Sequence, residues 1–351
     1  MKVLIGFMIL SARCVKVTIN ESSSQLTDSA RQELFRNTAD RMGLPDAIVE
    51  KDFWVCFTLD HLFHHSRWKD SISFKGGTSL SKAFRLINRF SEDIDIILDL
   101  CVLGYERDEP WKQRSKTKQD AFNKDANLRA ENFLSDIFCP EIKSGLSEAM
   151  GKDAEVSIDV TDKQTVNFVY PRLYTNKATL QIIRLEIGAL AAWTPAEIAQ
   201  ISSYAADSYP DVFEQKSTKI LTVAPERTFW EKATILHHEA NRPEQLAMPP
   251  RYSRHFYDLS CIAKSPVKDA AFSRLSLLQK VVDFKMKFYP RVWAKYEEDV
   301  PGTFKLVAPD YRMARLRADY EIMKDMLFGE KPDFEEVINT VRDLEEEING
   351  L

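Results

Sequence analysis

The chain has 351 residues, of which 44% are hydrophobic and 29% are charged. This balance is typical of a globular protein with a sizeable core, and it excludes a globally disordered chain. The formal net charge is −5, so overall charge does not indicate nucleic-acid binding, and any such contact requires a local basic patch. The five cysteines are scattered without C-x-x-C spacing, which fits neither a disulfide framework nor a zinc site.

The N-terminal segment, residues 1–28, is interpreted as a leader. Its apolar run over residues 3–10 has the outline of a signal peptide, but it is short and lacks a clean cleavage site. The cysteine pattern indicates a reducing compartment, so a leading strand or an extended translation start is favoured over secretion. No other stretch reaches the roughly 18 apolar residues of a membrane span. We therefore expect a cytoplasmic protein without membrane contact.

The first part of the chain alternates between helix and strand signals. Gly43 and Pro45 separate two helical patterns, and Gly76-Gly77 break a short extended run. Thr78 or Ser79 can cap the helix that follows. The expected elements are helices over residues 29–42 and 46–65, a strand over 71–74, a helix over 80–88 and a strand over 93–98.

The remainder of the chain separates into a charged segment, a strand-rich segment and a helical segment. Residues 107–150 are charged and helix-prone, which indicates an insertion or lid. Strands are expected over residues 156–160, 166–170 and 180–190, and helices over 225–241, 251–264, 267–288, 310–328 and 332–349. This order predicts an α+β fold with a mixed or antiparallel sheet. The expected parts are a core over residues 29–223 and a helical C-terminal domain over 224–351.

Asp93 and Asp95 stand two residues apart on the predicted strand 93–98. Alternate side chains of a strand share a face, so both carboxylates project together, with Cα atoms about 6.5 Å apart. Two carboxylates in this arrangement can hold Mg²⁺ ions for phosphoryl-group displacement. The alternative is a solvated strand face, and a lone Asp-x-Asp pattern usually means that.

The segment before this strand supplies a phosphate-binding pattern. Gly76-Gly77 allow close approach of the backbone to a phosphate, and the helix N-terminus that follows offers free N–H groups. Thr78 and Ser79 add hydroxyl donors. The alternative is an ordinary turn, but strand, glycine pair, helix and Asp-x-Asp strand occur in this order within about twenty residues, which favours a nucleotide site.

A third metal-binding carboxylate is expected from the strand around residue 186. Glu186 has apolar neighbours on both sides, and a charge in such surroundings must be paired or metal-bound. A surface ion pair between Arg184 and Glu186 is the alternative, and Asp159 is a weaker candidate for the same role.

Further candidates lie on the C-terminal helices and in the charged insertion. Lys232 can neutralise a triphosphate, although an ordinary solvated lysine explains it as well. Arg254 and Asp258 are four residues apart, which also suits a helix salt bridge. A basic cluster in the insertion is a candidate RNA-backbone contact, with a solvated helix face as the alternative. It comprises Lys112, Arg114, Lys116, Lys118 and Lys124.

Several blocks of the sequence resemble the AbiEii/AbiGii toxin family of nucleotidyltransferases. The resemblance spans about residues 30–265. The blocks are Glu50-Lys51-Asp52-Phe53-Trp54-Val55, Lys75-Gly76-Gly77-Thr78-Ser79-Leu80-Ser81-Lys82, Arg89-Phe90-Ser91-Glu92-Asp93-Ile94-Asp95, Pro225-Glu226-Arg227-Thr228-Phe229-Trp230-Glu231-Lys232 and Arg251-Tyr252-Ser253-Arg254-His255-Phe256-Tyr257-Asp258. This family has a DNA-polymerase-β-like core followed by a helical part, so the resemblance implies the same architecture here.

The resemblance also implies roles for individual residues. Lys232 would contact the nucleotide phosphates, Asp258 would be a further catalytic acid, and Glu186 matches the third metal-binding acid by order only. The implied catalytic residues are Asp93, Asp95, Lys232 and Asp258. The implied nucleotide-binding residues are Gly76, Gly77, Thr78, Ser79, Lys82, Arg89, Ser91 and Lys232. The implied metal ligands are Asp93, Asp95 and Glu186.

The resemblance finally implies a function. Characterised relatives are toxins of toxin–antitoxin or phage-defence pairs that transfer nucleotides from NTPs to the acceptor end of tRNA. We therefore expect a nucleotidyltransferase that uses Mg²⁺, or Mn²⁺ in its place, an NTP and an RNA acceptor, and that is held in check by a separately encoded antitoxin. The alternatives are transfer to a protein or small molecule, and an NTP-binding regulatory module without turnover.

Overall fold

The computed structural model describes residues 27–175, 180–190 and 195–351. The leader expected over residues 1–28 lies outside the described residues except at its end, where the Thr27 hydroxyl accepts a hydrogen bond from the N–H of Ala30 and caps the first helix. None of the helices in the described ranges is both long and apolar enough to cross a membrane.

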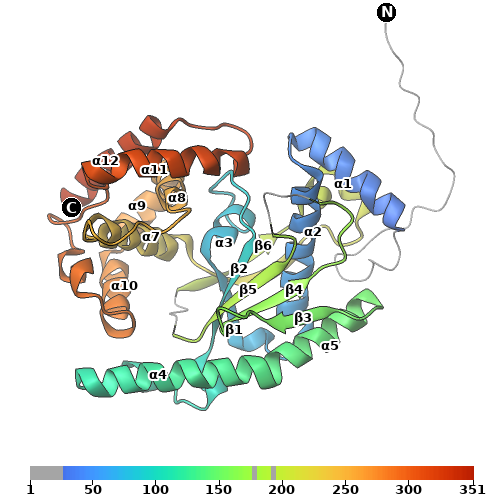
Figure 1. Ribbon diagram of the computed structural model, residues 1–351, viewed down its shortest axis with the longest axis horizontal. Helices are drawn as coiled ribbons and strands as arrows, with labels where there is room; N and C mark the ends of the chain where they lie inside the picture. Colours follow the sequence, from blue (N-terminus) through green and yellow to red (C-terminus); the bar gives the residue numbers. More distant parts are fainter. Residues whose placement is uncertain (1–26, 176–179, 191–194) are drawn as a thin grey trace, which may run out of the picture.

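In the described part of the chain, seven strands form one mixed sheet in the order β3-β4-β5-β2-β1-β7-β6 (Figure 1). The central strand β2 pairs antiparallel with β1 and parallel with β5, and β1 pairs parallel with β7. The strands are β1 (Ile72–Lys75), β2 (Asp93–Leu98), β3 (Glu155–Ile158), β4 (Thr165–Val169), β5 (Ile183–Gly188), β6 (Ala196–Ile201) and β7 (Thr218–Val223).

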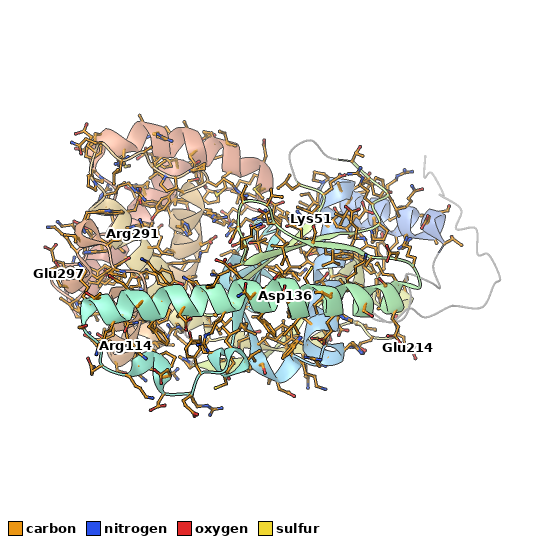
Figure 2. All side chains as sticks on the ribbon, turned by 60° about the horizontal axis from the view of Figure 1, so that its bottom comes forward. Lys51, Arg114, Asp136, Glu214, Arg291 and Glu297 are labelled. Atoms are coloured by element: carbon orange, nitrogen blue, oxygen red, sulfur yellow. The ribbon has the colours of Figure 1, made fainter. Side chains whose placement is uncertain are left out.

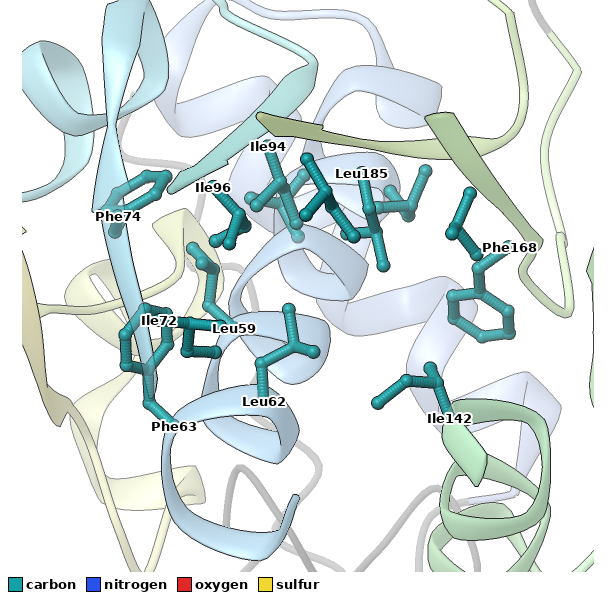
Figure 3. Close-up of a cluster of buried hydrophobic side chains, with 14 of the residues drawn as sticks. Leu59, Leu62, Phe63, Ile72, Phe74, Ile94, Ile96, Ile142, Phe168 and Leu185 are labelled. Atoms are coloured by element: carbon teal, nitrogen blue, oxygen red, sulfur yellow. The ribbon is translucent and has the colours of Figure 1, made fainter. Parts of the chain in front are cut away.

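Helices that precede α7 in the chain cover one face and one end of this sheet. They are α1 (Asp28–Met42), α2 (Asp46–Asp60), α3 (Gly76–Lys82), α4 (Lys116–Phe133), α5 (Cys139–Met150) and the short α6 (Tyr204–Ser208). The long α4 crosses the molecule and continues into α5 through a π-helical segment, Leu134–Phe138, which contains Asp136 (Figure 2). Apolar side chains of α2 and its continuation, such as Leu59 and Leu62, pack against Ile94 and Ile96 of β2 (Figure 3).

The helices of the C-terminal part lie together on the other side of α3 (Figure 1). They are α7 (Pro225–Ala240), α8 (Ser253–Ala263), α9 (Pro266–Phe272), α10 (Leu275–Phe288), α11 (Asp310–Met323) and α12 (Phe334–Asn349). These helices enclose a second hydrophobic core, which Leu80 and Ile87 also enter from the first half of the chain. The expected domain boundary at residue 224 falls between β7 and α7, and it stays a prediction because the two parts share this core.

The α+β fold class is confirmed, but several element boundaries were wrong. The helix expected over residues 80–88 begins at Gly76 and ends at Lys82, and Arg85 then adopts a φ of 53° that a helix cannot accommodate. The helix expected over 267–288 is two helices, α9 and α10. Strands β6 and β7 were not predicted, because their short sequences carry little strand signal. They are stabilised by pairing with each other and by the pairing of β7 with β1.

Candidate active site

Three carboxylates lie on the sheet face that is turned away from the core of Figure 3. Asp93 and Asp95 of β2 share this face by strand alternation, as their spacing predicts. The parallel register of β2 and β5 places Glu186 directly beside Asp95. The antiparallel register of β1 places Lys75 on the opposite side of Asp95. The sheet therefore brings the three predicted metal ligands together.

These carboxylates open into a cavity of about 160 Å³ between the sheet, the start of α3, and helices α7 and α8. The predicted site residues that line it are Gly76, Gly77, Arg89, Ser91, Asp93, Asp95, Glu186 and Lys232. The lining residues that sequence reasoning did not assign to the site are Lys75, Thr228, Glu231, Ile235, Arg254 and His255. Residues from distant parts of the chain thus converge on one cavity.

Burial and mutual repulsion disfavour the ionised form of two carboxylates on the acidic side of the cavity. Burial raises the pKa of Glu186 to about 7, and the like charges of Asp95 and Asp93 add to the effect. Burial likewise raises the pKa of Asp95, with the neighbouring Lys75 acting in the opposite direction. A bound cation would reduce the repulsion between these carboxylates when they ionise, so this face is suited to a metal ion.

Gly76 and Gly77 both lie so close to polar side chains that an added Cβ would collide with them. Gly76 has a φ of +85°, and a Cβ at this position would lie 1.9 Å from Oδ2 of Asp95. A Cβ on Gly77 would lie 2.6 Å from Nη2 of Arg89 and 3.0 Å from Oγ of Ser91. The missing side chains therefore leave room for the acidic wall at Gly76 and for the basic wall at Gly77.

The basic side of the cavity is built around one fully buried carboxylate. Asp258 accepts hydrogen bonds from Nε and Nη2 of Arg89 at 2.6 and 2.8 Å, and from Nζ of Lys232 at 2.7 Å. Burial alone would raise the pKa of Asp258, but Arg89 and Lys232 hold it well below its usual range. Two cations held by one anion leave this wall with net positive charge facing the cavity.

The model of the family described as "Nucleotidyl transferase AbiEii toxin, Type IV TA system" matches residues 58–340. The chain belongs to this family. It is a nucleotidyltransferase toxin of a type IV toxin–antitoxin system, as the resemblance implied. The solved structure of the nucleotidyltransferase toxin MenT4 from Mycobacterium tuberculosis H37Rv is similar at 18% identity, with a TM-score of 0.43, over 91% of this chain and 99% of that chain. No curated protein matches the sequence.

Four of the residues assigned to the site of this AbiEii-family enzyme do not line the cavity. The Thr78 hydroxyl donates to the backbone oxygen of Asp93 at 2.5 Å, and the Ser79 hydroxyl donates to that of Gly76 at 2.8 Å. Lys82 is buried 2.5 Å from Asp52. These three contacts hold the glycine pair and β2 in place. Asp258 stands behind Arg89 and Lys232, so the structure gives it a positioning role.

Buried charges of α2 explain another block of the family resemblance. Lys51 donates to Glu92 at 2.8 Å, next to Asp93 in the sequence, and Asp52 pairs with Lys82 at the end of α3. The Glu50 carboxylate accepts from the backbone N–H groups of Leu173 and Tyr174 at 2.6 and 3.0 Å. Three consecutive acidic and basic residues therefore anchor three different segments around the site, and Lys51 lies deep inside the molecule (Figure 2).

Two unassigned residues of α8 come from the block that ends at Asp258. Arg254 and His255 both line the cavity, and burial lowers the pKa of each. Asp258 forms its charged hydrogen bonds with Arg89 and Lys232. The helix salt bridge to Arg254 that the sequence suggested is therefore not the main contact of Asp258. The i,i+4 spacing of Arg254 and Asp258 was the available signal, because it places both on one side of the helix.

The carboxylate face fits a divalent metal in its ligand chemistry. Asp93, Asp95 and Glu186 supply the oxygen ligands that Mg²⁺ prefers. Among the described residues, no three His, Cys, Asp or Glu side chains converge tightly enough to form a ready-made metal site.

The position of Arg184 is compatible with both interpretations of Glu186, as half of an ion pair and as a member of the carboxylate cluster. Its guanidinium lies 3.8 Å from Glu186, 3.7 Å from Asp93 and 3.1 Å from Asp159. The expected Arg184–Glu186 pair and the carboxylate cluster therefore both exist. Asp159 does not line the cavity, and its carboxylate is held by Arg184 and by the side chains of Thr161 and Asn167.

Proposed function

We propose that this AbiEii-family nucleotidyltransferase transfers a nucleoside monophosphate from an NTP to an RNA acceptor, the 3′ end of tRNA, with Mg²⁺ or Mn²⁺. We further propose that it acts in the cytoplasm, is restrained by a separately encoded antitoxin, and serves phage defence. The observation that carries the catalytic part is the cavity itself. Its acidic wall and its basic wall face each other, which suits a metal-bound triphosphate.

Each wall has a distinct task in this proposal. Arg89 and Lys232 neutralise the phosphates of the NTP, and the cavity-lining Gly76 and Gly77 let the backbone approach them. Asp93, Asp95 and Glu186 would hold the metal, which when bound supplies positive charge to the phosphate oxygens. The acceptor hydroxyl gives up its proton to water and its oxygen forms a bond to the α-phosphorus. The bond between the α-phosphorus and the oxygen that bridges to the β-phosphorus breaks, and pyrophosphate leaves.

The test is incubation of the purified protein with total tRNA and each radiolabelled NTP in turn, with Mg²⁺ present. Label in tRNA from one or more NTPs supports the proposal, and Asp95→Asn serves as the inactive control. Label in protein or in a small molecule, with none in RNA, would favour those acceptors instead. Calorimetric NTP binding without any labelled product would favour the regulatory module.

A further inference from the structure

The structure divides the basic cluster of residues 112–124 into two groups. Lys112 and Arg114 share the carboxylate of Glu109, each at 2.6 Å, so their charges are already partly neutralised. Lys116 and Lys118 are exposed at the start of α4. They are two residues apart on a helix and therefore point to different sides. The cluster is not one uniform basic face.

Lys116 belongs to a surface groove of about 620 Å³ between the start of α4 and the end of α10. The side chain of Trp111 forms part of this groove. Its ring packs 5.6 Å from Phe288 and 6.3 Å from Phe284, yet 45% of the residue stays exposed. A large aromatic ring that is anchored from behind and open in front suits stacking against a planar ligand.

Cations outnumber anions along the groove. Arg114, Lys116 and Lys287 line it together with Asp120 and Asp283. Lys287 donates to the backbone oxygen of Lys112 at 2.8 Å, and Asn123 donates to that of Lys287 at 3.3 Å. These contacts fix the loop before α4 against α10. In Figure 2, Arg114 lies at this end of α4.

The segment 283–290 lines the groove, and α10 packs against α7, the helix that carries several lining residues of the candidate active site. Lys285 donates to the backbone oxygen of the cavity-lining Glu231 at 3.3 Å. Tyr289, directly after α10, donates from its hydroxyl to the backbone oxygen of Leu190 at 2.7 Å. Its neighbours Met286, Lys287 and Pro290 line the groove.

We propose that this groove binds the single-stranded end of the RNA acceptor, with a base stacked on Trp111 and phosphates beside Lys116 and Lys287. The inference rests on the proposed RNA acceptor and adds where that acceptor lies. An exposed aromatic ring beside cations is the combination that single-stranded nucleic acids require. A protein partner at the same groove is the competing outcome that the experiments below distinguish.

The first experiment measures binding of a fluorescent single-stranded RNA by anisotropy, together with NTP binding by calorimetry. Trp111→Ala should weaken RNA binding about tenfold or more, because one stacked base is lost. Trp111→Phe should retain most of the affinity. Tyr311→Ala, at a similarly exposed aromatic on α11 (50% exposed), is the matched control and should change nothing. NTP affinity should be the same in all four proteins.

The second experiment compares charge reversals at Lys116 and Lys118, which point to different sides of α4. Lys116→Glu, in the groove, should weaken RNA binding and flatten its dependence on the logarithm of salt concentration by about 0.7 units for each lost phosphate contact. Lys118→Glu makes the same charge change outside the groove and should have a clearly smaller effect. Equal effects of the two reversals would mean that only general charge matters, which contradicts the groove.

The outcomes separate this inference from the proposed function. If the wild-type protein labels tRNA while Trp111→Ala and Lys116→Glu bind and label it normally, the groove is wrong and the function stands. If no RNA is labelled or bound, both fall. If Trp111→Ala loses antitoxin binding and keeps RNA binding, the groove is a protein site. Should Trp111→Ala fail to fold, Lys116→Glu and photo-crosslinking of a thiouridine-tipped RNA to residues 109–116 decide.

Discussion

On one wall of the candidate active site, Asp93, Asp95 and Glu186 lie side by side on β2 and β5. On the other wall, Arg89 and Lys232 hold the buried Asp258 between them. In the basic wall, hydrogen bonds to Asp258 hold both cations in place in the protein alone. In the acidic wall, burial and mutual repulsion raise the pKa of Glu186 to about 7.

This difference indicates which wall depends on the ligand. Hydrogen bonds position the cations before any nucleotide arrives, so the protein need not order them during binding. Lys75 and Arg184 balance the charge of the carboxylates only in part, and a bound metal ion would supply further positive charge. Substitutions on the acidic wall should therefore mainly affect activity, whereas those behind the basic wall should also affect folding.

The largest effect is expected for Asp95→Asn. Loss of this carboxylate should lower nucleotide transfer about 1,000-fold, equivalent to roughly 4 kcal/mol, because the metal loses a ligand. Thermal stability in the absence of metal should stay equal or rise, since one repelling charge is removed. Asp211→Asn, at a fully exposed position, is the matched control. Normal turnover by Asp95→Asn with Mg²⁺ present would sink the site assignment.

Asp258→Asn should show the opposite pattern, with a large loss of stability. It leaves Arg89 and Lys232 buried without their counter-charge, which typically costs about 3 kcal/mol or more. Urea denaturation measures this loss. Adding Lys232→Met to Asp258→Asn should restore part of the stability, because one of the two unpaired cations is removed. A fully stable Asp258→Asn protein would contradict the positioning role.

The two glycines allow each wall to be disturbed separately. Gly76→Ala drives a Cβ into Asp95 and should raise the metal concentration needed for activity. Gly77→Ala pushes on Arg89 and should weaken NTP binding about tenfold, a change of roughly 1.4 kcal/mol, and Gly77→Val should do so more strongly. Calorimetry with NTP and with metal distinguishes the two.

Gly151→Ala is the control for the backbone strain that Gly76→Ala introduces. Gly151 also has a positive φ of +64°, but nothing lies within 4 Å of the added Cβ. It should therefore share the strain of Gly76→Ala, about 1–2 kcal/mol, without any change in metal or nucleotide binding. Wild-type NTP affinity in a folded Gly77→Val protein would place the phosphate site elsewhere.

The smallest expected effect is on pH dependence. Glu186 is protonated below its pKa of about 7, so the metal must displace a proton there. The Mg²⁺ concentration for half-maximal activity should rise up to about tenfold per pH unit as the pH falls below 7. Glu186→Gln should flatten this rise, and Glu214→Gln, at an exposed site, should leave it unchanged.

The raised pKa of Glu186 also predicts how the folding stability of the metal-free protein changes with pH. Its pKa is higher in the folded protein than its ordinary value of 4.5, so ionisation is costlier in the folded state. Metal-free protein should therefore lose the contribution of this group as the pH rises from about 4.5 to 7. Saturating Mg²⁺ should abolish the loss. An identical stability profile for Glu186→Gln would show that Glu186 does not titrate in this range.

The sequence alone determined the local features of the site. Asp93 and Asp95 share a face because strand alternation depends only on neighbouring residues, and the glycine pair before them marks a close approach of the backbone. Lys232 and Asp258 could be assigned only through the family resemblance, because their spacing equally suits a solvated lysine and a helix salt bridge. The α+β class followed from the order of the elements.

Only the tertiary structure decided how these pieces meet. Glu186 stands beside Asp95 because β5 pairs parallel with β2, and Arg89 reaches Asp258 across 169 residues of sequence. Thr78, Ser79 and Lys82 match the site by sequence, yet they support it from behind. Periodicity reports which residues share a face of one element, whereas burial and ion pairing depend on which elements pack together, and that is set by contacts between distant parts of the chain.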